Sequence, residues 1–444
     1  MRRGMMGILM GAIALSASPA LAQQTWIDGS PVQTRIRVGA DGQTFVGVWI
    51  DAPDQTPARR ARAPMAVSLV VDTSGSMAGD KIHNARMAAA SLLESMADGD
   101  IVSIYGFSNQ VTEFAPPTVV SAATRGQLMQ RVNQLYAAGG TNLYGGMQAG
   151  ISRMGQAPGS HPVRRVFLIS DGHANIGPSD PHSLSNLAAG ATEFGTQITG
   201  IGVGLSYDQT TLSAMVVRSS GRLYHLAQPQ QMASILQEEM SLLSRSVAVN
   251  AYIEIIPAPG VRILEGATTG AVVENGRLRL PLGQVYAGQH REVLFRAQLD
   301  TQREGSRPLA QARLVYAQPG ERGTQTQETL LRYHVTRDAS AAARSQAPAV
   351  AAMVANHEAT TAQRRAAELM RAGQGQQAAA QLAQARTVLA AAAEEAPEAE
   401  GRALRQRAQR FEQAQERASG ARSAPAQAAA AYDFADEAMA AEGY

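Results

Sequence analysis

The chain has 444 residues, of which 45% are hydrophobic and 17% are charged, and its mean hydropathy of −0.15 excludes a polytopic membrane protein. Arg2 and Arg3 account for the formal charge of +2, because the other 37 of its 39 basic residues balance 37 acidic ones, so a nucleic-acid-binding protein is not expected. The absence of cysteine excludes disulfides, thiolate nucleophiles and zinc ribbons.

Residues 1–22 have the pattern of a secretory signal peptide. Two arginines precede an apolar stretch from Met5 to Leu15, and Ala20-Leu21-Ala22 is a small-x-small cleavage motif. A signal anchor is the alternative, which the shortness of the apolar stretch disfavours. We expect cleavage, a periplasmic or secreted mature chain, and no membrane span after cleavage, because no later segment approaches 18 uninterrupted apolar residues.

The first elements expected after the signal are two short strands. Residues 34–38 and 44–50 alternate in polarity around a Gly39–Gly42 turn, which predicts a β-hairpin. An isolated two-stranded hairpin is marginally stable in water. The segment 23–60 is therefore expected to join strands that come later in the chain.

Residues 65–244 have the pattern of an α/β domain. Continuous apolar runs alternate with helical stretches, which predicts a parallel sheet covered on both faces by helices. The predicted strands are 66–71, 101–105, 165–169 and 197–203, and the predicted helices are 80–97, 124–135, 142–154, 183–194, 208–219 and 229–244.

Residues 245–337 return to a period of two, punctuated by glycine and proline, which indicates antiparallel strands. If the 23–60 hairpin joins them, the α/β domain is an insertion in an antiparallel β-sandwich. The chain then ends in an alanine-rich region, 338–444, with helices expected at 345–371, 376–395 and 398–418.

Two interpretations of the alanine-rich region are open. Its first two long helices resemble a single tetratricopeptide-type hairpin, which favours a peptide-binding groove. The other interpretation is a helical stalk or a partly disordered tail.

Side chains with oxygen donors lie in three of the loops that connect the predicted strands and helices. Asp72, Ser74 and Ser76 lie on one turn after the first α/β strand, Thr141 follows a Gly-Gly pair before a helix, and Asp171 follows another apolar strand. Because ligands of open α/β sheets bind outside the carboxyl ends of the strands, these loops are expected to converge. Oxygen donors at one focus suit a small hard cation. The first turn alone is weak evidence, since Ser76 could simply cap a helix.

The motif Asp-x-Ser-x-Ser, followed in order by Gly-Gly-Thr and Ser-Asp-Gly, resembles the von Willebrand factor A (VWA) domain and its metal-ion-dependent adhesion site (MIDAS). The resemblance covers about residues 65–244 and implies a Rossmann-like fold. The run 202–208 and the β segment after it resemble the bacterial subgroup labelled calcium-activated chloride channel homologues. That label implies no pore.

The resemblance implies a metal site with a defined division of roles. Ser74 and Ser76 would coordinate Mg²⁺ directly, Thr141 directly or through water, and Asp72 and Asp171 chiefly through water. Few direct carboxylates leave the ion under-neutralised with an open position, which an acidic side chain of a partner protein could fill. Mn²⁺ or Ca²⁺ could substitute for Mg²⁺.

The expected function is therefore non-enzymatic, metal-dependent binding of a partner protein. A structural envelope scaffold, whose metal only rigidifies loops, is the alternative. A Mg²⁺-dependent hydrolase with His173 as base is less favoured, because a loop histidine beside an acidic site is more often an exposed residue or a neighbour of the metal ligands. No H-E-x-x-H or G-x-S-x-G motif indicates zinc-protease or serine-hydrolase chemistry.

Overall fold

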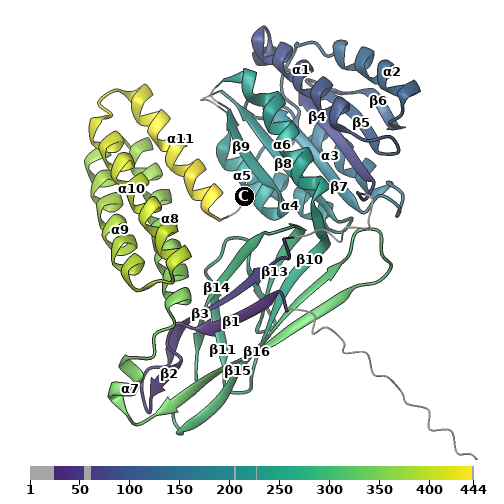
Figure 1. Cartoon of the computed structure of the whole chain (residues 1–444). Coiled ribbons are helices and arrows are strands. Elements are labelled where there is room, and N and C mark those ends of the chain that lie inside the picture. The colour runs from purple at the N-terminus through teal and green to yellow at the C-terminus, as the bar shows by residue number, and fades with distance from the viewer. Residues whose placement is uncertain (1–24, 55–61, 205–206, 227, 443–444) are drawn as a thin grey trace, which may run out of the picture.

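The computed structural model in Figure 1 describes residues 25–54, 62–204, 207–226 and 228–442. The predicted signal peptide, residues 1–22, lies outside the described residues. Among the helices in those ranges, none is long and apolar enough to cross a membrane.

The α/β domain is built on one six-stranded sheet, in the order β6-β5-β4-β7-β8-β9. The strands β4, β5, β7, β8 and β9 run parallel, and β6 runs antiparallel to β5. The strands are β4 (Met65–Asp72), β5 (Ile101–Phe107), β6 (Val111–Val119), β7 (Val163–Ser170), β8 (Thr196–Val203) and β9 (Arg222–Leu226).

Helices cover both faces of this sheet. They are η1 (Gly75–Met77), α1 (Asp80–Ser95), α2 (Ala122–Asn133), α3 (Leu143–Gly155), α4 (Pro181–Thr192), α5 (Gln209–Arg218), η2 (Pro229–Gln231) and α6 (Met232–Ser244). The central strand β4 is buried on both sides, because Leu69 packs in the apolar cluster of α1, α2 and α6 while Val70 packs in that of α3, α4 and α5. This explains why β4 is a continuous apolar run and not an alternating one.

The expectation of a purely parallel sheet is wrong at one edge. Strand β6 is antiparallel, and neither β6 nor β9 was predicted from the sequence. Much of β6 is exposed, and it contains Pro116 and Pro117, which an edge strand tolerates because one side of its backbone faces solvent. Such a strand lacks the apolar run by which its neighbours are recognised.

Two further sheets contain the strands before and after the α/β domain. One has the order β1-β3-β14-β11 and the other β12-β13-β10-β15-β16-β2. Their strands are β1 (Ile27–Pro31), β2 (Arg35–Arg37), β3 (Gln43–Asp51), β10 (Ser246–Pro257), β11 (Arg262–Gly266), β12 (Val272–Glu274), β13 (Arg277–Tyr286), β14 (His290–Gln298), β15 (Gly305–Ala317) and β16 (Gln325–Thr336). One apolar cluster is shared by both sheets and includes Val48 of β3 and Leu314 of β15.

The predicted hairpin at 34–50 is not formed. Strand β2 pairs in parallel with β16, whereas β3 pairs antiparallel with β1 and β14 in the other sheet. The intervening turn bonds to a different part of the chain: the Gly39 N–H donates to Thr301 O (3.0 Å), and the Leu299 N–H donates to Gly42 O (2.9 Å). Ile36 of β2 and the alternate residues Val46, Val48 and Ile50 of β3 still lie in the shared cluster, so the alternation was correct and only the pairing was not.

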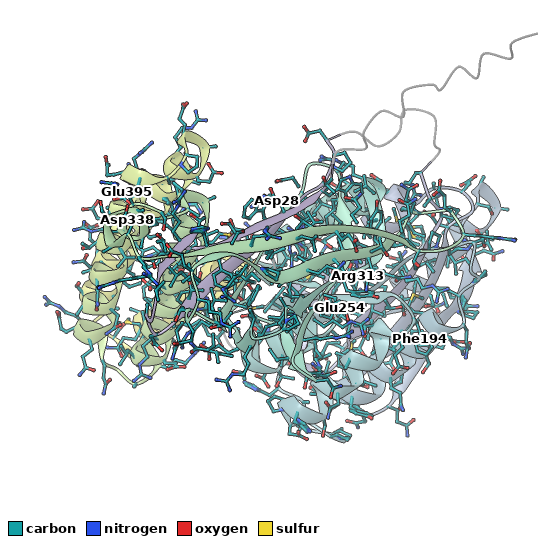
Figure 2. All side chains as sticks on the ribbon, turned by 90° about the horizontal axis from the view of Figure 1, so that it is seen from below. Asp28, Phe194, Glu254, Arg313, Asp338 and Glu395 are labelled. Atoms are coloured by element: carbon teal, nitrogen blue, oxygen red, sulfur yellow. The ribbon has the colours of Figure 1, made fainter. Side chains whose placement is uncertain are left out.

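Cross-strand ion pairs line the outer face of the six-stranded sheet β12-β13-β10-β15-β16-β2, here called the longer sheet. Glu254 of β10 and Arg313 of β15 are direct register partners, and their charged groups lie 3.4 Å apart. Figure 2 shows the two residues side by side on these strands. A pair of opposite charges in register supports this strand pairing.

The C-terminal region is a bundle of packed helices. It comprises α7 (Ala339–Ala343), α8 (Pro348–Arg371), α9 (Gly375–Glu395), α10 (Glu398–Gly420) and α11 (Ala424–Ala441). The four long helices share one cluster rich in alanine, in which Phe411 and Phe434 are fully buried. Helix α11 was missed by the sequence analysis. The interpretation of this region as a stalk or a partly disordered tail is wrong for the described residues, because the small alanine side chains allow the helices to pack closely together.

The bundle contacts both other parts of the chain. Val350 and Met353 of α8 pack on Leu294 of β14, and Met439 of α11 belongs to an apolar cluster of the α/β domain. Figure 1 shows α11 (yellow) on the side of the bundle that faces this domain. The helical region is therefore held against the α/β domain and does not extend away from it.

Candidate metal site at the carboxyl end of the parallel sheet

Asp72, the last residue of β4, anchors the site. It is fully buried, and its Oδ1 accepts a hydrogen bond from the Ser74 N–H (2.8 Å) while its Oδ2 accepts one from Ser170 Oγ (2.7 Å). Burial raises the pKa of Asp72, an effect that these bonds oppose and the nearby charge of Asp171 reinforces. The carboxylate is thus held in one orientation at the strand end.

A chain of hydrogen bonds links the first turn to Asp171. Ser74 Oγ and Ser76 Oγ lie 3.0 Å apart, and Ser76 Oγ donates to Asp171 Oδ1 (2.8 Å). Ser74 and Asp171 are 2% and 3% exposed, whereas Ser76 is an exposed residue. The group therefore opens to solvent beside Ser76.

Thr141 is brought to the same place by backbone contacts between two loops. The Gly75 N–H donates to Gly139 O (2.9 Å), and the Ala138 N–H donates to Thr73 O (2.8 Å). A Cβ on Gly172 would lie 3.6 Å from Ser76 Oγ and 3.8 Å from Thr141 Oγ1, so both hydroxyls flank this glycine.

The structure thus assembles all five predicted residues into one group, here called the oxygen cluster: Asp72, Ser74, Ser76, Thr141 and Asp171. Two carboxylates and three hydroxyls form a donor set of oxygen atoms only, which is the chemistry that Mg²⁺, Mn²⁺ and Ca²⁺ prefer. Its two acids and its opening to solvent fit a hard divalent cation.

One residue beside the oxygen cluster was missed by the sequence analysis. Lys81, in the first turn of α1, places its Nζ in an ion pair with Asp171 Oδ2. It is the only lysine in the chain, so its position nine residues after Asp72 was an available signal.

His173, the residue considered as a base, is not part of the cluster. Its side chain is 70% exposed, and its Nδ1 lies 3.6 Å from Asp208 Oδ2. Asp208 caps the start of α5, where its Oδ1 accepts a hydrogen bond from the Thr211 N–H (3.1 Å). The partner of His173 is therefore the loop before α5 and not the oxygen cluster.

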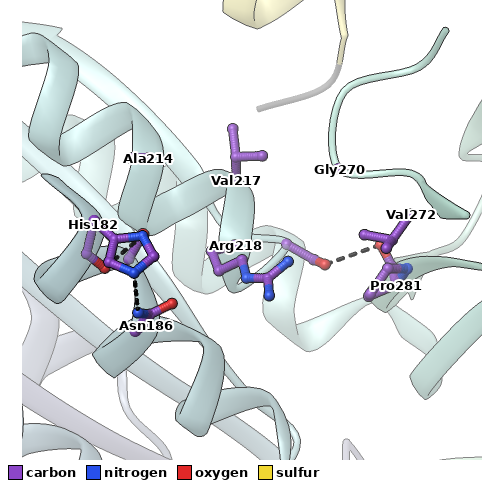
Figure 3. Close-up of a pocket in the computed structure, with 10 residues that line it drawn as sticks. His182, Asn186, Ala214, Val217, Arg218, Gly270, Val272 and Pro281 are labelled. Carbon is purple, nitrogen blue, oxygen red and sulfur yellow. Dashed lines mark hydrogen bonds between the residues drawn. The ribbon is translucent and has the colours of Figure 1, made fainter. Parts of the chain in front are cut away.

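Two cavities lie away from the oxygen cluster. Figure 3 shows one of about 390 Å³ between α4, α5 and β12–β13, where His182 Nε2 and Asn186 Nδ2 lie 3.0 Å apart and Ser220 Oγ donates to Pro281 O (2.9 Å). The other, of about 620 Å³, lies between β14 and the helical bundle. Neither has the oxygen cluster in its lining.

The stretch of sequence that contains the oxygen cluster matches a known family. Residues 67–173 match the family model of the von Willebrand factor type A domain, a stretch that contains the whole oxygen cluster. The chain therefore carries a VWA domain.

Solved structures show the same fold over nearly the whole chain. A von Willebrand factor type A protein from Catenulispora acidiphila superposes with a TM-score of 0.74 at 15% identity, covering 94% of this chain and 96% of that one. The ArnB paralog VWA2 from Sulfolobus acidocaldarius superposes with a TM-score of 0.60 at 16% identity, covering 94% and 98%.

Curated relatives share more sequence identity with this chain than those structures do, but they match a smaller part of it. An uncharacterized protein of Synechocystis is 23% identical over 69% of this chain and 71% of its own length. Inter-alpha-trypsin inhibitor heavy chain H3 of Mesocricetus auratus is 26% identical over 48% of this chain, and YfbK of Escherichia coli, also uncharacterized, is 25% identical over 59%. The chain spans only 26% of the first of these two and 46% of the second.

Proposed function

We propose that this VWA domain protein binds a partner protein through a Mg²⁺ ion held by the oxygen cluster, without enzymatic activity. The observation that carries the proposal is the hydrogen-bonded chain from Ser74 through Ser76 to Asp171, next to the buried carboxylate of Asp72. These side chains already converge, so a cation would find its donors preorganised.

The direct ligands would be the hydroxyls of Ser74, Ser76 and Thr141. Hydroxyls carry no formal charge, so an ion held mainly by them keeps most of its positive charge. Because Ser76 is exposed, an open coordination position faces solvent, where an acidic side chain of a partner can reach it. Mn²⁺ or Ca²⁺ would serve in place of Mg²⁺ if the ligand geometry relaxes.

The proposal includes a periplasmic or secreted location. It is supported by the basic, apolar and small-x-small segments of residues 1–22. Membership of the bacterial subgroup labelled calcium-activated chloride channel homologues is part of the same proposal, on the strength of the run 202–208 and the β strands after it.

A structural envelope scaffold is the second candidate. Backbone hydrogen bonds tie the loops of the metal site together, as in the bonds from Gly75 to Gly139 and from Ala138 to Thr73. In that case the metal would only add rigidity, and binding of partners by the β sheets or the helical bundle would ignore chelation.

Two experiments on the mature chain, residues 23–444, test the proposal: the first tests the metal site and the second separates the two candidates. Titration calorimetry with MgCl₂ should show one binding site, which Asp72→Ala and Ser76→Ala remove. Asp80→Ala is the matched control, because Asp80 is an exposed carboxylate at the start of α1.

The same proteins then serve as bait in envelope extract, with Mg²⁺ or with EDTA. Recovery of a partner only by the wild type and the Asp80→Ala control, and only with Mg²⁺, would support metal-dependent binding. Equal recovery of the partner in all samples would favour the structural scaffold over metal-dependent binding.

A further inference from the structure

The single lysine of the chain lies against the proposed metal site. The Nζ of Lys81 forms an ion pair with Asp171 Oδ2, and the Asp171 side chain is 0% exposed. The remaining 38 basic residues are arginines, and none of the ion pairs within the described residues joins an arginine to the oxygen cluster. The ion pair therefore supplies the cluster's only partner of opposite charge in those ranges.

Both oxygens of Asp171 are already in use. Oδ1 accepts a hydrogen bond from Ser76 Oγ (2.8 Å), and Oδ2 is paired with the ammonium of Lys81. Asp72 differs, because its partners are the Ser74 N–H and Ser170 Oγ, which are neutral. Lys81 thus neutralises one of the two carboxylates whose charge a divalent cation would need.

An ammonium and a divalent cation repel each other at close range. At an effective dielectric constant near 20, two unit charges 4 Å apart interact by several times the thermal energy, and a divalent ion doubles that. Close approach of both cations to Asp171 is therefore unfavourable, and one must withdraw.

Lys81 is the cation that can withdraw. Lysine carries its charge on a flexible four-carbon stem, and this side chain is already 30% exposed. Nearby is Gly204, which has no side chain to block the ammonium: a Cβ built there would lie 4.0 Å from Nζ. The Lys81 side chain is therefore already in contact with solvent before any displacement.

We infer that Lys81 is an exchangeable internal cation, which pairs with Asp171 when the site holds no metal and is displaced into solvent when a divalent cation binds. The inference rests on the proposed function and adds a determinant of its metal affinity. The ion pair keeps the buried carboxylate neutralised in the metal-free protein. Because Mg²⁺ must break this pair in order to bind, the presence of Lys81 lowers the affinity for Mg²⁺. The competing interpretation is a permanent salt bridge that fastens α1 to the end of β7.

The first test uses the uniqueness of this lysine. Protein grown with ¹³C-lysine has one Cε resonance from residues 23–444, so the signal needs no assignment. Addition of MgCl₂ should shift and sharpen this resonance as the ammonium leaves Asp171, and EDTA should reverse the change. A resonance that stays unchanged while calorimetry shows Mg²⁺ bound would overturn the inference and leave the proposed function standing.

The second test measures affinity. Lys81→Met keeps the length of the side chain but removes its charge, and should lower the dissociation constant for Mg²⁺ about tenfold. Lys81→Arg keeps the charge and should bind Mg²⁺ close to the wild-type affinity. Arg131→Met, on exposed α2, is the charge-matched control and should leave the affinity unchanged.

Equal affinity of Lys81→Met and the wild type would show a permanent salt bridge and overturn the inference. Weaker Mg²⁺ binding by Lys81→Met would also overturn the inference, because the lysine would then favour metal binding and not compete with it. If neither protein binds Mg²⁺, the inference fails together with the proposed function.

Discussion

The hydroxyl of Tyr432, on the last helix, donates a hydrogen bond to the backbone carbonyl of Tyr207, at the start of α5 (3.1 Å). The ring of His225 completes the contact, since it stacks on Tyr432 at 5.5 Å and on Tyr207 at 5.4 Å. Tyr207 precedes Asp208, which faces His173 in the loop of Asp171. The helical bundle therefore holds the segment that borders the metal site.

This contact predicts coupling between α11 and the segment at Tyr207. In Tyr432→Ala, loss of the aromatic stack should destabilise the docking of α11 by about 1 kcal/mol beyond the lost burial. Hydrogen exchange followed by mass spectrometry should then be faster in both α11 and residues 207–218. Tyr432→Phe keeps the ring, loses one hydrogen bond, and should have a smaller effect.

Tyr136→Ala serves as the control, because that tyrosine is 66% exposed on the α/β domain. Unchanged exchange at residues 207–218 in Tyr432→Ala would show that the bundle does not restrain the segment.

Metal binding should raise the thermal stability of the mature chain. A ligand at 100 times its dissociation constant stabilises the native state by about 2.7 kcal/mol, so Mg²⁺ should raise Tm by several degrees and EDTA should reverse the rise. Ser76→Ala removes an exposed ligand at little cost to the fold and should abolish this response. Differential scanning calorimetry checks it, and a full Mg²⁺ response in Ser76→Ala would contradict the assigned ligand set.

The pairing of β14 with β3 should depend on pH through His290. Its Nε2 lies 3.3 Å from Glu292 Oε1 and its Nδ1 lies 2.7 Å from Asp51 Oδ1. The hydrogen bond with Glu292, followed by that with Asp51, raises the pKa of His290 to about 9, although partial burial opposes the shift.

Because the pKa of His290 is higher in the folded state than its usual value of 6.5, protonation stabilises the native protein. This contribution is fully present below pH 6.5 and is lost as the pH rises through about 9. Tm of the wild type should therefore exceed that of His290→Gln at pH 6, with the gap closing by pH 9.5 (roughly the folded pKa plus half a unit). The group is half exposed, so solvent screening keeps the gap small. A gap that is constant with pH would exclude this titration.

Arg165 should be required for the joint between the α/β domain and the longer β sheet. Its side chain is 1% exposed, and its guanidinium donates to Gln284 Oε1 (2.8 Å) and the Tyr286 hydroxyl (2.7 Å), both on β13. The same guanidinium lies 4.0 Å from the fully buried carboxylate of Glu239.

Arg165→Met would remove a positive charge beside Glu239 and would leave three hydrogen-bond acceptors without this donor, namely those of Thr199, Gln284 and Tyr286. Removing one partner of a buried pair costs about 3–5 kcal/mol, although Arg222 still pairs with Glu239 at 3.2 Å, so we expect the lower end of that range. Urea denaturation measures the loss. Arg131→Met, an exposed arginine, is the control, and equal stability of the two variants would show that the network at Arg165 contributes nothing.

Much of the α/β domain could be predicted because its signals are local. The apolar runs ending at Asp72 and Ser170 are buried strands, and the observed helices start within about three residues of their predicted positions. The predictions failed where the sequence lacked a marked hydrophobic pattern, as in the exposed edge strand β6. Helix α11 was missed because its alanines lack a marked apolar stripe, although Ser423 caps it by accepting from the Ala426 N–H.

The five residues of the oxygen cluster could be chosen from the sequence, because they match the VWA metal motif that the sequence resembles. Their convergence could be expected, because each follows a recognisable strand or precedes a helix and such loops meet at one edge of a parallel sheet. The tertiary structure alone decided contacts between distant segments. In the tertiary structure β2 and β3 lie in different sheets, because alternation specifies which face of a strand is buried but not the strand with which it pairs. The tertiary structure also placed Lys81 on Asp171 and Tyr432 on Tyr207, because a charge or an aromatic ring carries no local mark of the residue that it will meet after folding.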